Sequence, residues 1–171
     1  MDKHIFLKKK ALTRLQCDEI IHFVDNNCVN DIVYEYHQGS LSNTPLPFIL
    51  QALKYGMDEY VSKHKFLANL YAPWEIVDRY SLQKYTPGRA YYTEHMEHGK
   101  DSHDGKRLLA WMIYLNDVKD GGGTRFPQQN FTAKARTGDL YIWPAGWTHS
   151  HHGVVSNTET KYIATGWCSF I

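Results

Sequence analysis

A histidine and a glutamate near the middle of the chain have types and spacing suited to binding one metal ion. His95 and Glu97 lie in the run 91–97, YYTEHME, whose residues are typical of a β-strand. Side chains alternate between the two faces of a strand, so these two point the same way and Glu94 points the other way. A neutral imidazole and a carboxylate arranged in this way can share a metal ion, which needs at least one further ligand from a distant segment.

Candidate partners lie in the stretch 143–167, which contains His149, His151 and His152 and, beyond them, Lys161. Alternation along a strand puts His149 and His151 on one face and His152 on the other, but it does not choose between the first two. Two histidines and one carboxylate leave three coordination positions open, an arrangement typical of non-haem Fe(II) oxygenases. Zinc would favour a tetrahedral site, often with thiolates, and the sequence has no cysteine cluster.

Short β-type runs separated by Gly, Pro and Asp must position these side chains. We predict strands at 75–85, 90–97, 107–116, 123–126, 138–143, 148–155 and 161–170. Strands this short, with turn signals at this spacing, indicate an all-β sandwich or jelly roll.

The first part of the chain has helical patterns instead. Thr13 and Gln16 form a capping-box pattern ahead of a predicted amphipathic helix at 14–26. A short strand is expected near 32–37, and a second helix is expected to open at Thr44-Pro45. Both helices would pack on one face of the β-structure.

Composition sets outer limits on function. The chain has 171 residues, enough for one domain with a sizeable core, and its net charge of +1 gives no basic field for nucleic acid. No apolar run is long enough to suggest a membrane span, and no leader pattern is visible. Three cysteines without a CxxC pair fit a reducing compartment, so we expect a cytoplasmic protein.

Four segments of the second half carry a more specific pattern. They are Tyr85–Gly88 with Tyr92 and His95–Glu97, Arg107–Asn116, Gly121–Phe126, and His151 with Lys161, Thr165 and Trp167. Together they resemble the prolyl-4-hydroxylase-like branch of the Fe(II)/2-oxoglutarate-dependent oxygenases.

The sequence departs from the family pattern at two points. The family usually has Asp where this chain has Glu97, and one extra residue separates Gly88 from Tyr92. Tyr91 therefore competes with Tyr92 for the inward-facing role, although Tyr92 keeps the family's three-residue offset to His95.

The resemblance implies a role for each matching residue. The ten-residue offset from the distal histidine to Lys161 selects His151, so the Fe(II) ligands would be His95, Glu97 and His151. The cosubstrate 2-oxoglutarate would be held by Lys161 at its distal carboxylate, with Tyr85, Tyr114, Thr165 and Trp167 around it. Tyr92 would contact substrate, and Arg107 would be either a substrate contact or a surface charge.

The implied fold is mainly β, a double-stranded β-helix (jelly roll) with the N-terminal helices on one face. It would form a single oxygenase domain over 1–171, with 1–70 as helical support and 75–171 as the catalytic core. The implied function is a dioxygenase that uses Fe(II), 2-oxoglutarate and O2 to hydroxylate a prolyl residue in a peptide or protein. The polar loop 98–106 would cover the substrate entrance.

Three alternatives stay open. One is a 2-oxoglutarate oxygenase that acts on a non-prolyl substrate. Another is a cupin-like metal-binding or sensing module without turnover, which would not need Lys161, Tyr114 and Thr165. The last is a plain β-sandwich interaction domain, which would bind no stoichiometric iron.

Overall fold

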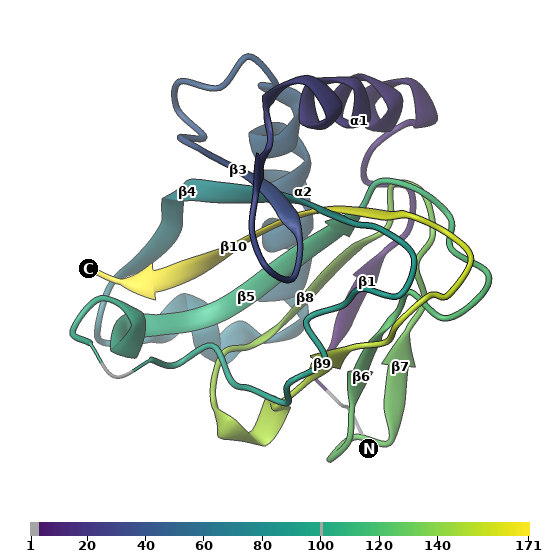
Figure 1. The fold of residues 1–171 in the computed structure, drawn as a ribbon. Helices are drawn as coiled ribbons and strands as arrows, with labels where there is room; N and C mark the ends of the chain where they lie inside the picture. Colours follow the sequence, from purple (N-terminus) through teal and green to yellow (C-terminus); the bar gives the residue numbers. More distant parts are fainter. Residues whose placement is uncertain (1–3, 100) are drawn as a thin grey trace.

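The computed structural model describes residues 4–99 and 101–171 (Figure 1). In this part of the chain, seven antiparallel strands form a major sheet in the order β1-β8-β5-β10-β4-β3-β2. In that order, their bounds are Phe6–Lys8, Leu140–Pro144, Arg107–Tyr114, Lys161–Phe170, Trp74–Tyr85, Glu35–Gly39 and Val29–Asn30. The long central strand β10 pairs with β4 on one side and β5 on the other, so it is covered by neighbours along both edges.

A minor sheet faces the major one. Among the described residues it contains three strands in the order β7-β6-β9, with bounds Phe131–Ala133, Thr124–Phe126 and His152–Gly153. Side chains from both sheets share one apolar cluster, in which Phe126 and Ala133 of the minor sheet meet Tyr114 and Trp143 of the major sheet. The predicted double-stranded β-helix is therefore confirmed.

Helix α1 (Arg14–Asn27) starts as the sequence predicts. The Thr13 hydroxyl accepts a hydrogen bond from the Gln16 backbone N–H, and the Gln16 side chain accepts one from the Thr13 N–H. This capping box satisfies two N–H groups that lack partners inside the helix.

Helix α2 (Phe48–Lys63) begins later than the predicted Thr44-Pro45. The Thr44 hydroxyl instead accepts from the Leu46 N–H and bonds the Tyr80 hydroxyl, which holds this segment as a turn. Three short 3-10 helices are also present in the described chain, η1 (Lys65–Asn69), η2 (Asp104–Lys106) and η3 (Trp147–His149). No helix within residues 4–99 and 101–171 is both long and apolar enough to cross a membrane.

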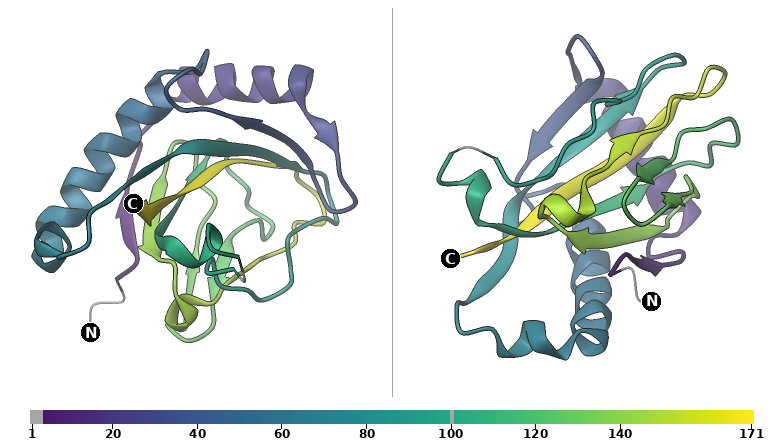
Figure 2. Two further views of the ribbon diagram at one scale, coloured as in Figure 1. Left: turned by 90° about the vertical axis from the view of Figure 1, so that its left-hand side faces the viewer. Right: turned by 90° about the horizontal axis from the view of Figure 1, so that it is seen from below.

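The central strands of the major sheet are covered on both faces, with different partners on each. Both helices lie over its outer face (Figure 2), where Ile20 of α1 and Leu53 of α2 join the cluster that contains Trp111 of β5. The preceding residue on β5, Ala110, belongs to the inner cluster between the sheets, as alternation requires. Each fully buried large apolar side chain of this kind contributes about 1.5–3 kcal/mol through its removal from water.

Two predicted strands are replaced by irregular chain. The segment predicted as a strand at 90–97 makes only one β-bridge, between His95 and His151. The segment predicted at 148–155 begins with the 3-10 helix η3 and keeps only the two residues of β9 as strand. Period-2 alternation is therefore not guaranteed in either segment, which matters for the residues they carry.

Replacing Gly138 tests how closely the chain packs at the start of α1. The φ angle of Gly138 is +79°, and an added Cβ would lie 2.1 Å from the Leu12 carbonyl oxygen. We expect Gly138→Ala to lower the free energy of unfolding in urea by about 1–2 kcal/mol for the left-handed backbone. Overpacking against Leu12 should add about 1–3 kcal/mol.

Gly88→Ala is the matched control, because φ is +82° there but no atom lies within 4 Å of the added Cβ. Its loss in free energy of unfolding should reflect the left-handed backbone alone. Equal losses in the two variants would contradict the close approach of Gly138 to Leu12.

Candidate metal centre and adjoining cavity

Two histidines far apart in the sequence face each other through their backbones. The His95 N–H donates to the His151 carbonyl at 3.0 Å, and the His151 N–H donates to the His95 carbonyl at 2.9 Å. The Glu97 N–H donates to the Ala145 carbonyl at 3.0 Å, and the Gly153 N–H donates to the Tyr91 carbonyl at 2.7 Å. The segment 91–97 is thus joined to the chain on both sides of His151, and the centroids of the two imidazoles lie 4.5 Å apart.

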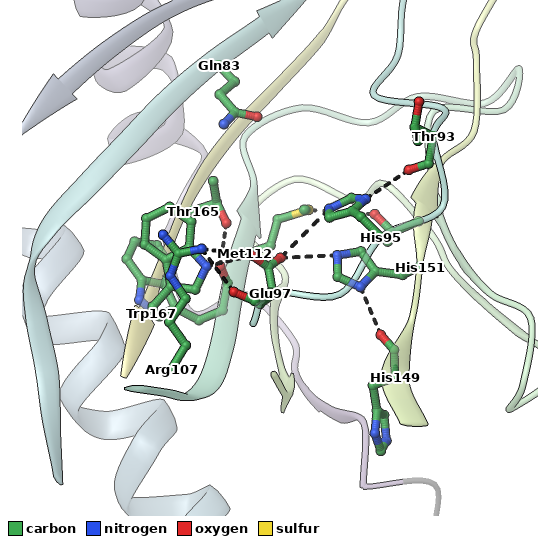
Figure 3. A network of polar contacts seen from close by, with 12 residues as sticks. Gln83, Thr93, His95, Glu97, Arg107, Met112, His149, His151, Thr165 and Trp167 are labelled. Carbon is green, nitrogen blue, oxygen red and sulfur yellow. Dashed lines mark hydrogen bonds and ion pairs between the residues drawn. The ribbon is translucent and has the colours of Figure 1, made fainter. Parts of the chain in front are cut away.

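Backbone carbonyls also fix the orientation of both rings (Figure 3). His95 Nδ1 lies 2.9 Å from the Thr93 carbonyl oxygen, and His151 Nδ1 lies 2.9 Å from the His149 carbonyl oxygen. A carbonyl can only accept, so each Nδ1 carries a hydrogen, and each Nε2 is the ring atom left to face Glu97 or a metal ion. This is the arrangement in which metal-binding histidines are commonly held.

Glu97 completes the cluster. Its Oε1 lies 3.2 Å from His151 Nε2 and 4.0 Å from His95 Nε2, and one ligand atom from each residue lies within 4.8 Å of the others. A carboxylate oxygen and an imidazole lone pair this close repel each other unless a proton or a metal ion lies between them. The three groups therefore fit a metal ion by their chemistry as well as by their positions.

The charges of the cluster also suit a cation. Burial raises the pKa of Glu97, but the interactions with His151, Trp167 and His95 outweigh it and lower the pKa to about 2. Burial, together with the neighbouring His151, lowers the pKa of His95 and favours its neutral form. An ionised carboxylate beside neutral imidazole is the protonation state that ligation requires.

Arg107 is part of this cluster and is not a free surface charge. Its guanidinium lies 3.8 Å from the centroid of the Trp167 ring, and its Nη1 donates to the Glu97 backbone carbonyl at 3.0 Å. Its Nη2 forms an ion pair with Asp104 Oδ1 at 2.6 Å. The side chain is therefore held from three sides.

A cavity of about 330 Å³ adjoins the three candidate ligands. Strand β10 contributes every second residue from Lys161 to Trp167, and β4 contributes every second residue from Ser81 to Tyr85, as alternation predicts. Other lining residues include Tyr91, Met96, Arg107, Met112 and Thr124.

Lys161 is a buried cation in this cavity. Its residue is only 4% exposed, and its Nζ lies 4.5 Å from the ring centroid of Tyr85, its register partner on β4. Burial lowers the pKa of Lys161 to about 8. It forms no ion pair with any residue that the structure describes. A buried ammonium without a carboxylate partner is costly, so the cavity suits an anionic ligand.

The hydroxyl groups named from the sequence have partners within the protein. Tyr114 does not line the cavity; its hydroxyl bonds the Thr124 hydroxyl at 2.7 Å, and Thr124 lines the cavity instead. The Thr165 hydroxyl donates to the Trp111 carbonyl at 2.7 Å, and the Tyr85 hydroxyl donates to Gln83 at 2.8 Å. That Tyr114 binds the ligand stays a prediction; the structure places Thr124 of the minor sheet, which bonds the Tyr114 hydroxyl, at the cavity wall.

The sequence leaves Tyr91 and Tyr92 in competition for the inward-facing position, and the structure places Tyr91 there. That Tyr92 contacts substrate stays a prediction. Tyr92 is 70% exposed, whereas Tyr91 lines the cavity and packs edge-on against His95, with ring centroids 4.6 Å apart. The Tyr92 N–H donates to the Ala90 carbonyl, so the chain turns at Tyr91. The three-residue offset to His95 favours Tyr92, but the chain at 90–97 is irregular, so neither spacing nor alternation determines which tyrosine faces the cavity.

The side chain of His149 lies outside the candidate metal cluster. It lies in η3, and Figure 3 shows its ring directed away from the cluster while its carbonyl holds the His151 ring. The choice between the two histidines thus depends on a turn that alternation along a strand does not describe.

Sequence reasoning assigned no role to Gln83, Met112 or Thr124. Each had a signal: Gln83 and Met112 lie two residues before Tyr85 and Tyr114, and Thr124 lies in the Gly-rich motif. In the loop 98–106, Gly99 and Asp104 line the cavity, and Lys100 lies outside the described residues.

Several solved structures share the fold. The viral collagen prolyl hydroxylase of Paramecium bursaria Chlorella virus-1, in its 2-oxoglutarate complex, matches with a TM-score of 0.78 and 19% identity, over 98% of this chain and 96% of that one. A prolyl-4-hydroxylase of Pseudomonas putida matches with a TM-score of 0.70 and 15% identity, over 98% and 93% of the chains. A Trichoplax adhaerens prolyl hydroxylase in complex with a peptide of hypoxia-inducible factor matches with a TM-score of 0.73 and 14% identity, over 98% and 84%.

Sequence comparison gives the family. A protein of Acanthamoeba polyphaga mimivirus named "Putative prolyl 4-hydroxylase" is 30% identical over 112 residues, which is 56% of this chain and 46% of that protein. The model of the 2OG-Fe(II) oxygenase superfamily matches residues 80–169, more than half of the chain. The resemblance seen in the sequence, and the Fe(II) and 2-oxoglutarate that it implies, are therefore confirmed at the level of the family. The chain belongs to the 2OG-Fe(II) oxygenase superfamily.

Proposed function

We propose that this protein is an Fe(II)- and 2-oxoglutarate-dependent dioxygenase that hydroxylates a prolyl residue in a peptide or protein. One observation supports this proposal above the others. The same cavity is lined by the candidate ligands His95, Glu97 and His151 and by Lys161. Lys161 is a buried cation without an anionic partner among the described residues. A metal-binding module without turnover has no use for that second feature.

The metal ligands would be His95 Nε2, His151 Nε2 and Glu97 Oε1. This set would hold Fe(II) and would leave coordination positions open for other ligands. When bound, Fe(II) supplies O2 activation with 2-oxoglutarate as the electron source. In the overall reaction, a C–H group, O2 and 2-oxoglutarate give a C–OH group, succinate and CO2.

The protein's own residues would hold the cosubstrate by charge and hydrogen bonding. The Lys161 ammonium pairs with the distal carboxylate of 2-oxoglutarate. The Tyr114 hydroxyl can donate to the Thr124 hydroxyl oxygen. The Thr124 hydroxyl hydrogen, which otherwise makes a weak contact with the Met112 sulfur at 3.7 Å, could then be donated to the same carboxylate. Tyr85 and Ile163 give this part of the cavity apolar walls, which exclude water from the ion pair.

A peptide substrate would bind beside the candidate metal ligands. Tyr91 packs against His95, Arg107 bonds the Glu97 carbonyl, and both line the cavity together with Met96. The prolyl hydroxylases among the structural matches, one of them with a bound peptide, support a prolyl target. We propose that residues 1–171 form one oxygenase domain, in which residues 1–70 support the catalytic core.

Succinate formation tests the proposed reaction. Protein purified without oxygen is incubated with Fe(II) and 2-oxoglutarate, O2 is admitted, and succinate is measured with and without a library of proline-containing peptides. We expect succinate formation that a peptide stimulates, together with a gain of one oxygen atom in that peptide by mass spectrometry. A correctly folded protein that forms no succinate under any condition would exclude the enzyme.

Two histidine variants test the ligand assignment. His151→Ala should abolish Fe(II) binding and succinate formation, because it removes one of three ligands. His149→Ala should retain both, because the backbone carbonyl that orients His151 remains. The reverse result would show that the wrong histidine has been chosen.

The pH dependence of stability tests whether Lys161 is a buried cation without a partner. Its pKa is about 8 in the folded protein and about 10.5 in an unfolded chain. Below pH 8 both states carry the proton, so the folded state bears the full cost of the buried charge. Between pH 8 and 10.5 the unfolded state binds more protons, so the free energy of unfolding rises with pH.

Lys161→Met, which cannot titrate, is the reference for this measurement. In urea unfolding of the ligand-free protein, the stability advantage of Lys161→Met over the wild type should shrink by up to about 3 kcal/mol from pH 7 to pH 10.5. A constant difference would mean that Lys161 has an anionic partner. The same variant should also need a higher 2-oxoglutarate concentration for succinate formation.

A further inference from the structure

Glu97 stands where the family pattern has Asp, and its longer side chain has more freedom to misplace its carboxylate. We propose that Trp167 is the positioning residue for this glutamate. It holds Oε2 so that Oε1 alone is presented to the metal, and the bidentate and rotated arrangements open to a free glutamate are excluded. This inference rests on the proposed metal site and adds the residue that adapts the site to glutamate.

The two carboxylate oxygens have separate partners. Oε2 accepts a hydrogen bond from Trp167 Nε1 at 2.7 Å, whereas Oε1 lies nearest the two imidazoles, 3.2 Å from His151 Nε2 (Figure 3). The indole has one N–H and no acceptor, so it can only donate. A hydrogen bond to an ionised carboxylate in a buried site is among the stronger kinds, and here it selects one oxygen for the metal.

The position of the indole is itself fixed. The Arg107 guanidinium covers the Trp167 ring at 3.8 Å, while Arg107 Nη1 bonds the Glu97 carbonyl and Nη2 pairs with Asp104. On β5 the register partner of Trp167 is Ala110, whose small side chain leaves room for the ring. Arg107 thus links the backbone of Glu97 to the ring that holds its side chain.

The pairing of β10 with β4 is irregular at this position. Its register shifts between Gly166 and Cys168, where Trp167 alone stands opposite residues 77–79 of β4. The extra residues therefore lie on β4, the strand that a bulge bends. Trp167 keeps its register with Ala110 on β5, so the strand that carries the indole is held regularly on that side.

An aspartate at position 97 would be one methylene shorter. It could keep the metal or the Trp167 N–H within reach, but it would not reach both from the same backbone position. The effects of side-chain length at position 97 and of the Trp167 N–H on the free energy of metal binding should therefore be coupled.

Co(II) binding tests the role of Trp167 without turnover. The dissociation constant is measured by calorimetry and the ligand field by visible absorption, with Co(II) as the probe. The proteins are the wild type, Trp167→Phe, and a variant with β-(3-benzothienyl)alanine at 167, which keeps the ring shape but replaces N–H by sulfur. We expect both variants to lose about tenfold or more in Co(II) affinity and to show an altered spectrum.

Trp147→Phe is the matched control, since Trp147 is 70% exposed and does not line the cavity. It should bind Co(II) as the wild type does. Unchanged affinity and spectrum in the benzothienyl variant would overturn the proposal, and this variant decides the matter if Trp167→Phe fails to fold.

A double-mutant cycle then tests the coupling. Glu97→Asp should weaken Co(II) binding more in the wild type than in Trp167→Phe, because the second background has already lost the hydrogen bond. Additive effects on the free energy of binding would overturn the proposed coupling. If the wild type binds no stoichiometric Co(II), the proposed metal site fails; if it binds and the Trp167 variants bind equally well, only the role of Trp167 fails.

Discussion

The reciprocal backbone hydrogen bonds between His95 and His151 are the contact on which the candidate site depends. They join the segment after β4 to the segment before β9, which lie far apart in the chain. Each imidazole is then turned by a nearby backbone carbonyl, at Thr93 and His149. The positions of two candidate metal ligands are therefore set by main-chain geometry, so little side-chain entropy remains to be lost when an ion binds.

The major sheet supports this contact because one of its faces packs against the helices while the other lines the cavity. On β10, Ala164 and Cys168 pack in the apolar cluster under the helices, while Lys161, Thr165 and Trp167 line the cavity. Helices α1 and α2 contribute no cavity-lining residue in the described chain; they bury the outer face and so keep the central strands in place. Chemistry on one face thus depends on packing on the other.

The two buried charges of the cavity differ in whether they have partners in the protein. Glu97 has local partners in His151 and Trp167, which more than offset the cost of its burial. Lys161 has no such partner among the described residues, and burial lowers its pKa to about 8. A site that binds an anionic cosubstrate gains from this asymmetry, because the ligand supplies the missing charge and its binding relieves a cost already present in the folded protein.

The sequence by itself determined the class of fold, the family, and the candidate set of two histidines and a carboxylate, because regular strands impose period-2 alternation and the motifs keep fixed spacings. The motif spacing paired His95 with Glu97 although their segment is not a regular strand. Alternation was able to find Gln83, which lies two residues before Tyr85 on β4. Only the tertiary structure decided that Tyr91 faces the cavity instead of Tyr92, and that Thr124 lies between Tyr114 and the cavity. The physical reason is that these positions depend on a turn and on the approach of a second sheet, which are fixed by hydrogen bonds between segments distant in the chain and leave no periodic trace in the sequence.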